Sequence, residues 1–233
     1  MAAASLRALA AQVLTGVLQD GAHLSAALRQ RMPSLPLAHD AALVQELCYG
    51  TLRFRPRLEF WLSRLLQQPL KARDGDIHVL LLLGLYQLAE MRIPAHAAVQ
   101  ETAEACRHLR KEWAVKLVNA VLRRFQRERV RLQAELSGNE AALYAHPRWL
   151  LQRIRADWPR DWQAILHANN SRPPFSLRIN RRVTTRADLL GEFTAAGMAA
   201  QPGGFSADAI VLAQPLHVEM LPGFAAGKFS VQD

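Results

Sequence analysis

Apolar residues are nearly continuous from Ile77 to Ala89, and this stretch predicts the central element of the chain. A helix that is apolar on every side must be buried on every side, and a bilayer span would need about 20 such residues. A buried strand is the alternative, but leucine outnumbers the β-branched residues and Asp74 or Asp76 can serve as an N-cap. We therefore expect a buried central helix in an all-α domain.

Apolar residues at helical spacing predict further helices through most of the first 136 residues. Met32–Pro36 should interrupt them, because two prolines within four residues cannot continue a helix. The expected helices run from Leu6 to Asp20, Ala22 to Arg31, Leu37 to Arg53, Pro56 to Pro69 and Ile93 to His108.

Glu112–Leu136 has the most regular amphipathic pattern in the chain. Its apolar residues, from Ala114 to Phe125, recur at i, i+3, i+4, i+7, i+8 and i+11, which places them on one face of a helix. We expect a cationic ridge on the opposite face, and an ordinary solvated face is the alternative. The basic residues there are Lys116, Arg123, Arg124, Arg127 and Arg131.

Ser137–Asn139 should end this helix, and we expect a domain boundary here that separates residues 1–136 from residues 137–233. The second part mixes short helices with alternating, strand-like segments. The fold class expected is mainly α, an all-helical bundle followed by a small α+β subdomain. The expected elements are helices near Arg148–Ala156, Arg160–Ala168 and Thr184–Ala196 (capped by Thr184 or Thr185), and strands at Phe175–Asn180, Ala209–Leu212 and His217–Met220.

The charge is basic and unevenly distributed. The formal net charge is +9 and the sequence pI about 10.5. Residues 1–136 carry 19 Lys and Arg against 12 Asp and Glu, whereas residues 137–233 carry 10 against 8. Arginine predominates, and its planar guanidinium suits bidentate phosphate contacts. The first part therefore carries most of the field that would attract a polyanion such as a nucleic acid.

Catalytic motifs are not evident. The sequence has neither a Gly-x-Gly-x-x-Gly after a strand nor a Gly-rich loop ending in Gly-Lys-Ser/Thr, and its histidines lack metal-ligand spacing. Cys48 and Cys106 lie among apolar, helical neighbours, so we expect reduced core thiols rather than nucleophiles or a disulfide. No secretory signal pattern is seen at the N-terminus, and we expect a cytoplasmic protein.

Several phrases of the sequence resemble a known family. Asp40, ELCYGTLR at Glu46–Arg53, LGLYQ at Leu83–Gln87, IPAHAAVQE at Ile93–Glu101 and VNAVLR at Val118–Arg123 resemble the NusB-type RNA-binding helical domain. Later phrases resemble the Sun/Fmu family of bacterial 16S ribosomal RNA cytosine-C5 methyltransferases, in which a NusB-like domain comes first. These are HPRWL at His146–Leu150, ANNSRPP at Ala168–Pro174, LRIN at Leu177–Asn180, LPGF at Leu221–Phe224 and VQD at Val231–Asp233.

The resemblance implies a division of labour. In that family the S-adenosyl-L-methionine site and the catalytic cysteines follow the Val-Gln-Asp phrase at which this sequence stops. It therefore implies that the chain is the rRNA-docking part of a methyltransferase and is inactive alone, with no cofactor bound. It also implies that Cys48 and Cys106 are not the catalytic pair.

The candidate RNA contacts are basic residues near the expected ridge and in a second cluster around Arg55. Arg7 and Arg53 could instead pair with Asp40 or Glu46 as structural ion pairs. The asparagines at 169, 170 and 180 are more readily explained as capping and turn residues than as RNA contacts. The candidates are Arg7, Arg53, Arg55, Arg57, Lys116, Arg123, Arg124 and Arg127.

A second hypothesis is a NusB-like, transcription-factor-type module that binds a protein partner and has no enzymatic role. Glu101 and Glu104, on one expected helix, and the groove beside them would then matter more than the ridge. RNA binding driven by charge should weaken log-linearly as salt rises, whereas a protein contact should respond less. The expected partner is small-subunit ribosomal RNA, with no membrane and no specificity for DNA.

Overall fold

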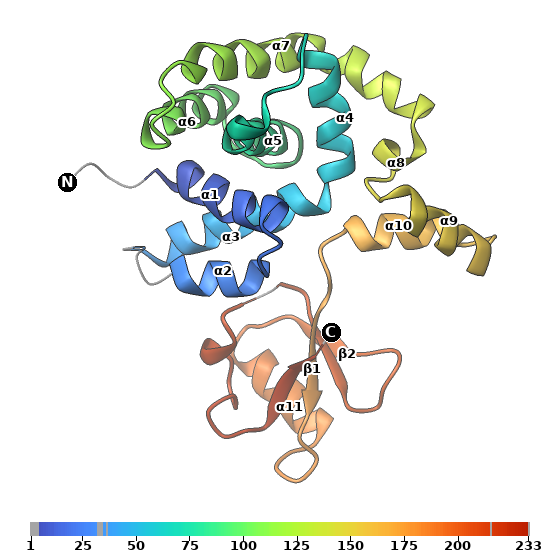
Figure 1. Ribbon diagram of the computed structural model, residues 1–233. Helices are drawn as coiled ribbons and strands as arrows, with labels where there is room; N and C mark the ends of the chain where they lie inside the picture. The colour runs from blue at the N-terminus through green and yellow to red at the C-terminus, as the bar shows by residue number, and fades with distance from the viewer. Residues whose placement is uncertain (1–4, 32–34, 36, 215, 233) are drawn as a thin grey trace. The chain divides into compact units, whose positions relative to one another are not determined.

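The computed structural model describes residues 5–31, 35, 37–214 and 216–232 (Figure 1). Four residues of the predicted break (Met32, Pro33, Ser34 and Pro36) lie outside these ranges. The chain forms two compact units, the first ending at Asn170 and the second beginning at Ser171. None of the helices within the described ranges is long and apolar enough to cross a membrane.

The first unit is helical and is built around α5 (Gly75–Glu90), as Figure 1 shows. Residues 79–88 of α5 are all buried, and α5 packs against α1, α3, α4, α6 and α7, which confirms the predicted central helix. Asp74 occupies the N-cap position without capping through its side chain. The surrounding helices are α1 (Leu6–Gln19), α2 (Leu24–Arg31), α3 (Ala38–Arg53), α4 (Arg55–Leu65), α6 (Ala95–His108) and α7 (Ala114–Ala134).

Three shorter helices complete the first unit: α8 (Glu140–Leu143), α9 (Arg148–Asp157) and α10 (Trp162–Asn170). Ala142 of α8 belongs to the core that also contains α5 and α7. Arg57 of α4 donates hydrogen bonds to the carbonyls of Ala142 (3.2 Å) and Leu143 (2.6 Å). These contacts join α8 to α4 within the first compact unit, which extends to Asn170. The domain boundary expected after residue 136 stays a prediction.

The second unit is a four-stranded antiparallel sheet with the order β2-β3-β1-β4 and one helix, α11 (Arg186–Ala195). Leu177 of β1 faces Ile210 of β3 and Val231 of β4 in the register. Thr185 is the N-cap of α11 and accepts a hydrogen bond from the Asp188 amide. The strands are β1 (Phe175–Ile179), β2 (Ala200–Pro202), β3 (Ala209–Leu212) and β4 (Phe229–Gln232).

One predicted strand is wrong and two observed strands were not predicted. His217–Met220 does not join the sheet, because local bonds such as Met220 N–H to His217 O form a 3-10 helix at Val218–Met220. Strand β2 has only three residues, and β4 buries only Phe229, so neither shows the alternation that marks a strand in the sequence. The predicted α+β class of this part is nevertheless confirmed.

Candidate nucleic-acid interface

Helix α7 presents cations to solvent because its apolar stripe is buried in the bundle. Val118, Leu122 and Phe125 are buried, as the periodicity predicted. Lys116, Arg123 and Arg127 are exposed, and no ion pair between described residues involves them. The ridge is therefore exposed as predicted, while its contact with RNA stays a prediction.

Arg124 differs from its neighbours because its guanidinium turns toward α4. It donates a hydrogen bond to the Leu65 carbonyl at the end of that helix (3.1 Å) and pairs with Glu128 one turn further along α7 (2.7 Å). Arg131 pairs with Glu128 and Glu135. Two of the five ridge cations, Arg124 and Arg131, are thus partly neutralised by the carboxylates of Glu128 and Glu135.

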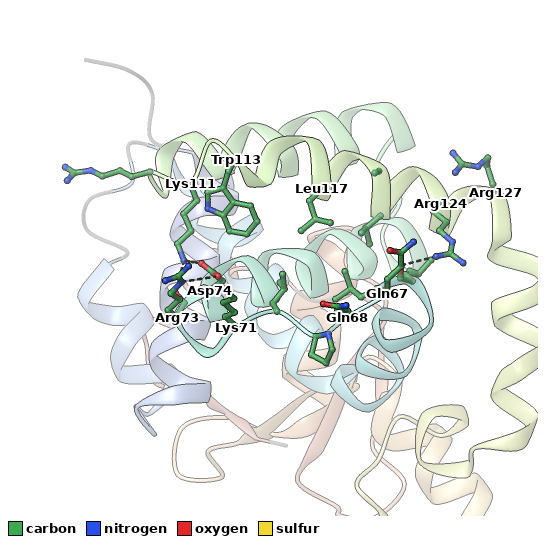
Figure 2. Close-up of a pocket in the computed structure, with 17 residues that line it drawn as sticks. Gln67, Gln68, Lys71, Arg73, Asp74, Lys111, Trp113, Leu117, Arg124 and Arg127 are labelled. Atoms are coloured by element: carbon green, nitrogen blue, oxygen red, sulfur yellow. Dashed lines mark hydrogen bonds and ion pairs between the residues drawn. The ribbon is translucent and has the colours of Figure 1, made fainter.

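A groove of about 960 Å³ lies between α7 and the segment that joins α4 to α5, and we call it the α7 groove (Figure 2). Leu70, Leu117 and Val121 supply apolar lining, and Gln67 and Gln68 supply amides. Six cationic side chains line it against one carboxylate, that of Asp74. The cations are Lys71, Arg73, Arg110, Lys111, Arg124 and Arg127.

Ion pairing leaves much of this charge available. Lys111 is bound to Asp74 (2.9 Å) and Asp76 (2.6 Å). Burial opposes its charge, but the hydrogen bonds and attraction of the two carboxylates outweigh burial and raise the pKa of Lys111. Lys71, Arg110 and Arg127 have no ion pair with any described residue. Three free cations in one groove form a surface to which phosphates would be attracted.

The second predicted cluster does not reach this groove. Arg53 is exposed and has no ion pair within the described ranges, whereas Arg55 pairs with Glu59 on its own helix (3.3 Å). Arg57 is held by the α8 carbonyls, by Glu90 (3.1 Å) and by the Phe54 ring, 5.4 Å from its guanidinium carbon. Of this cluster, Arg53 therefore has the most freedom to contact a ligand.

Arg7 lies inside the bundle. Its side chain is 11% exposed, and its Nε donates to Gln87 Oε1 (3.1 Å), with Glu101 at 3.9 Å. Burial lowers the pKa of Arg7, and the attraction of Glu101 only partly offsets this. The predicted alternative of a structural role fits this placement, but the partners are Gln87 and Glu101 rather than Asp40 or Glu46.

The remaining polar candidates have structural partners. Asn180 Oδ1 accepts from the Arg182 amide (3.1 Å), and its Nδ2 donates to the Gly227 carbonyl (3.0 Å). Asn170 donates to the Tyr144 carbonyl (2.7 Å), and Asn169 lies 3.5 Å from His146. The predicted turn role fits Asn180, whose side chain accepts from an amide two residues later, whereas Asn169 and Asn170 contact residues of a distant segment instead.

Both cysteines are free and buried, as predicted. Burial raises the pKa of Cys48 to about 12 and that of Cys106 to about 11. Thiols of this kind are protonated at neutral pH and are poor nucleophiles. Across the described ranges, no group of His, Cys, Asp and Glu side chains is placed to hold a metal ion.

Sequence reasoning missed several residues that line the groove together with Arg124 and Arg127. Lys71, Arg73, Arg110, Lys111 and Trp113 come from the connections between helices rather than from an amphipathic face. One signal was available: Arg107–Trp113 reads RHLRKEW, a dense basic run that ends in a tryptophan. The combination of basic and aromatic residues between two helices marks a candidate nucleic-acid surface.

Two family models match the chain. The NusB family matches residues 4–127, and the "Methyltr_RsmF/B-like, ferredoxin-like domain" matches residues 146–219. The predicted boundary at 136/137 lies between the two matches, and it stays a prediction.

Curated relatives match nearly the whole chain. Proteins named "Ribosomal RNA small subunit methyltransferase B" are 47% identical in Pseudomonas syringae pv. tomato, 46% in Pseudomonas putida and 44% in Vibrio cholerae. The matches cover 97%, 97% and 98% of this chain but 50%, 52% and 52% of the relatives. The chain thus spans about half the length of the curated relatives it matches.

A solved structure shares the fold. The "Crystal Structure of PH0851" matches with a TM-score of 0.62 at 12% sequence identity, over 100% of this chain and 54% of that one. At such low identity the likeness concerns the fold alone. The NusB match, in contrast, covers more than half of the chain. This protein therefore belongs to the NusB family, and it carries an RsmF/B-like, ferredoxin-like domain after the NusB region.

Proposed function

We propose that this chain is the RNA-binding N-terminal part of a small-subunit ribosomal RNA methyltransferase, and that it docks and orients the rRNA for a catalytic domain. The observation that carries the proposal is the α7 groove, where six cationic side chains face one carboxylate. Phosphate contacts of this kind supply affinity and register rather than sequence selection. The names of the relatives support rRNA as the ligand.

The proposal includes the reaction of the whole enzyme. The methyl donor is S-adenosyl-L-methionine and the acceptor is C5 of a cytosine in 16S rRNA. The donor site and the reacting groups belong to the part of the relatives that this chain does not cover. Because ribosomal RNA is the ligand, we place the protein in the cytoplasm. Residues 1–233 alone are expected to transfer no methyl group, and turnover of the donor by the purified chain would contradict this division.

The exposed cations of the groove allow a direct test of RNA binding. Lys71→Glu and Arg127→Glu, made together, should weaken binding of a small-subunit rRNA fragment by at least tenfold in a fluorescence anisotropy titration. They should also reduce the slope of log K against log salt by about 0.7 for each lost phosphate contact. Neither residue has an ion pair with a described residue, so the fold should not change.

Arg29→Glu is the matched control because Arg29 is an exposed cation of α2 that does not line the groove. It changes the net charge by as much as either single substitution does. Equal losses from Arg29→Glu and Lys71→Glu would show that binding depends on total charge and not on the groove. Unchanged binding by the groove variant would contradict the proposal.

The protein-partner hypothesis receives less support. Glu104 lines a smaller groove of about 490 Å³ beside α6, but it pairs with Arg107 of the same helix. Glu101 lies 3.9 Å from Arg7. Both acidic side chains are therefore already opposite cations of this chain, which leaves less charge for a partner to recognise.

A further inference from the structure

We propose that the α7 groove binds single-stranded RNA, with one unstacked base lying on the indole of Trp113 and the neighbouring phosphates contacting Lys71 and Arg110. The inference rests on the proposed RNA-binding function. It adds the strandedness of the ligand and the side chain that holds the base.

Trp113 is an exposed aromatic residue in the α7 groove. Its side chain is 54% exposed although it is one of the largest apolar groups in the chain. It lines the α7 groove between Lys111 and Leu117, as Figure 2 shows. No ring–ring or cation–ring contact between described residues involves it. An exposed indole within a basic groove is the usual platform for a nucleic-acid base, because every base has a stackable face.

Cationic side chains lie at both ends of the α7 groove (Figure 2). Lys71 and Arg73 lie near the Trp113 end of the groove, whereas Arg124 and Arg127 lie near the other end (Figure 2). Trp113 and Arg127 are separated by 14 positions, about 21 Å at 1.5 Å per residue along a helix. The groove is therefore long enough for several nucleotides, and it combines phosphate contacts at both ends with an apolar lining between them.

The backbone of Arg110, another residue of the groove, has an unusual conformation. Arg110 has a φ of +57°, the left-handed conformation that usually falls to glycine at this position after a helix. The amide of Lys111 donates to the Cys106 carbonyl (2.9 Å) and that of Arg110 to the Arg107 carbonyl (2.9 Å), which is the Schellman pattern. An arginine held in this strained conformation is destabilising for the fold. A charge required in the groove would explain why it stands there.

The apolar lining favours a single strand over a duplex. A double-stranded RNA helix presents its phosphates and 2′-hydroxyls outward and keeps its bases stacked, so it would leave Trp113 and Leu117 without a partner. A single strand can turn a base onto the indole. The exposed amides of Gln67 and Gln68, further along the groove, can then hydrogen-bond to base edges.

The test uses the 233-residue chain and three labelled probes. These are a single-stranded RNA of about eight nucleotides, the same strand with its bases removed, and the corresponding duplex. In anisotropy titrations the single strand should bind more tightly than the other two. Trp113→Ala should weaken its binding between about 5-fold and 100-fold, the range for loss of one stacked base, and Trp113→Phe should restore part of the loss. Trp149→Ala is the matched control, because Trp149 is 69% exposed on α9 and does not line the groove.

Arg110→Gly separates binding from folding. Glycine adopts a φ of +57° without strain, so the urea midpoint of the variant should stay the same or rise while RNA binding weakens about threefold or more. Ala145→Gly is the control, since Ala145 has a φ of +54° after α8 and is uncharged. Because Ala145 is buried, this change also removes a buried methyl group, so its midpoint is not compared with that of Arg110→Gly; it should leave RNA binding unchanged.

The outcomes distinguish this inference from the function on which it rests. If RNA binds and Lys71→Glu weakens it, but Trp113→Ala and removal of the bases have no effect, only the inference fails. Duplex binding equal to that of the single strand would also overturn the inference alone. Tighter binding of a polyglutamate peptide than of RNA would show that the groove is a protein site and would overturn both.

Discussion

Gly50 of α3 and the ring of Tyr86 of α5 are packed so closely that a Cβ on Gly50 would lie 1.9 Å from Cζ of Tyr86. The Tyr86 hydroxyl in turn donates a 2.5 Å hydrogen bond to Glu46, one turn earlier on α3. Burial is the main cause that raises the pKa of Tyr86, and the hydrogen bond to Glu46 adds to it. The absence of a side chain at Gly50 thus lets α3 approach the Tyr86 ring closely, and the Tyr86 hydroxyl bonds α5 to α3.

Gly50→Ala should lower the free energy of unfolding by about 1–3 kcal/mol, because the methyl group forces the Tyr86 ring out of a close-packed position. Urea unfolding followed by circular dichroism measures the change. Gly138→Ala is the control, since a Cβ at Gly138 meets nothing within 4 Å. A Gly50→Ala protein as stable as the parent would show that α3 and α5 can move apart without cost.

Gln87 should contribute through a buried polar network that joins three helices. Gln87 is fully buried; it accepts from Arg7 of α1 (3.1 Å) and donates to Thr102 of α6 (3.0 Å). Gln87→Leu leaves the Arg7 guanidinium without this acceptor and should cost about 1–3 kcal/mol of unfolding free energy. Adding Arg7→Met should cost less than the sum of the two single changes, because the same interaction is lost only once. Additive costs would contradict a shared network.

Glu59 should make stability depend on pH in the acidic range. Burial opposes its charge, but hydrogen bonds and attraction from His78 (2.8 Å) and Arg55 outweigh burial and lower the pKa of Glu59 below its usual 4.5. A lowered folded-state pKa stabilises the fold above the unfolded-state pKa, and this contribution is lost as pH falls through the folded-state value. Urea midpoints measured from pH 6 down to about pH 3 should therefore fall less steeply in Glu59→Gln than in the parent protein. Glu112→Gln, which removes an exposed carboxylate, is the control, and equal slopes in Glu59→Gln and the parent would refute the assignment.

Cys48 and Cys106 should react with a thiol reagent only when the protein unfolds. Both are fully buried, with pKa values of about 12 and about 11. In labelling with a chromogenic disulfide at pH 8, both thiols should react slowly in buffer and rapidly in concentrated urea. Cys48→Ala and Cys106→Ala assign the two phases. Rapid modification of either thiol in the native protein would show that the bundle opens locally at that helix.

The helical unit could be predicted because its elements are long and periodic. The stripe from Ala114 to Phe125 and the apolar run at Ile77–Ala89 each determine which face is buried, whatever the neighbours are. Strands β2 and β4 could not be predicted, because three or four residues with at most one buried side chain carry no periodicity. They exist through hydrogen bonds to β3 and β1, which are set by tertiary structure.

The candidate site was predictable only in part, for a related reason. Helical periodicity identified Arg124 and Arg127, because they lie on the polar face of α7. It could not indicate that Lys71 and Arg110 line the same groove, because both belong to connections whose path depends on packing. The clustering of Arg53, Arg55 and Arg57 in the sequence also suggested that all three are equally available to RNA. The structure shows that the Arg57 guanidinium is bound by two backbone carbonyls.

The two carbonyls that accept hydrogen bonds from Arg57 determine where a stable fragment of the protein can end. They belong to Ala142 and Leu143, the closing residues of a one-turn helix that Arg57 fastens to α4 from 85 positions away. A recombinant fragment that stops at residue 136 would leave the guanidinium with Glu90 but without its two carbonyl acceptors, and it would remove Ala142 from the core. A fragment that extends through Asn170 retains both hydrogen bonds of Arg57 to α8. We expect the fragment that stops at residue 136 to be insoluble on expression.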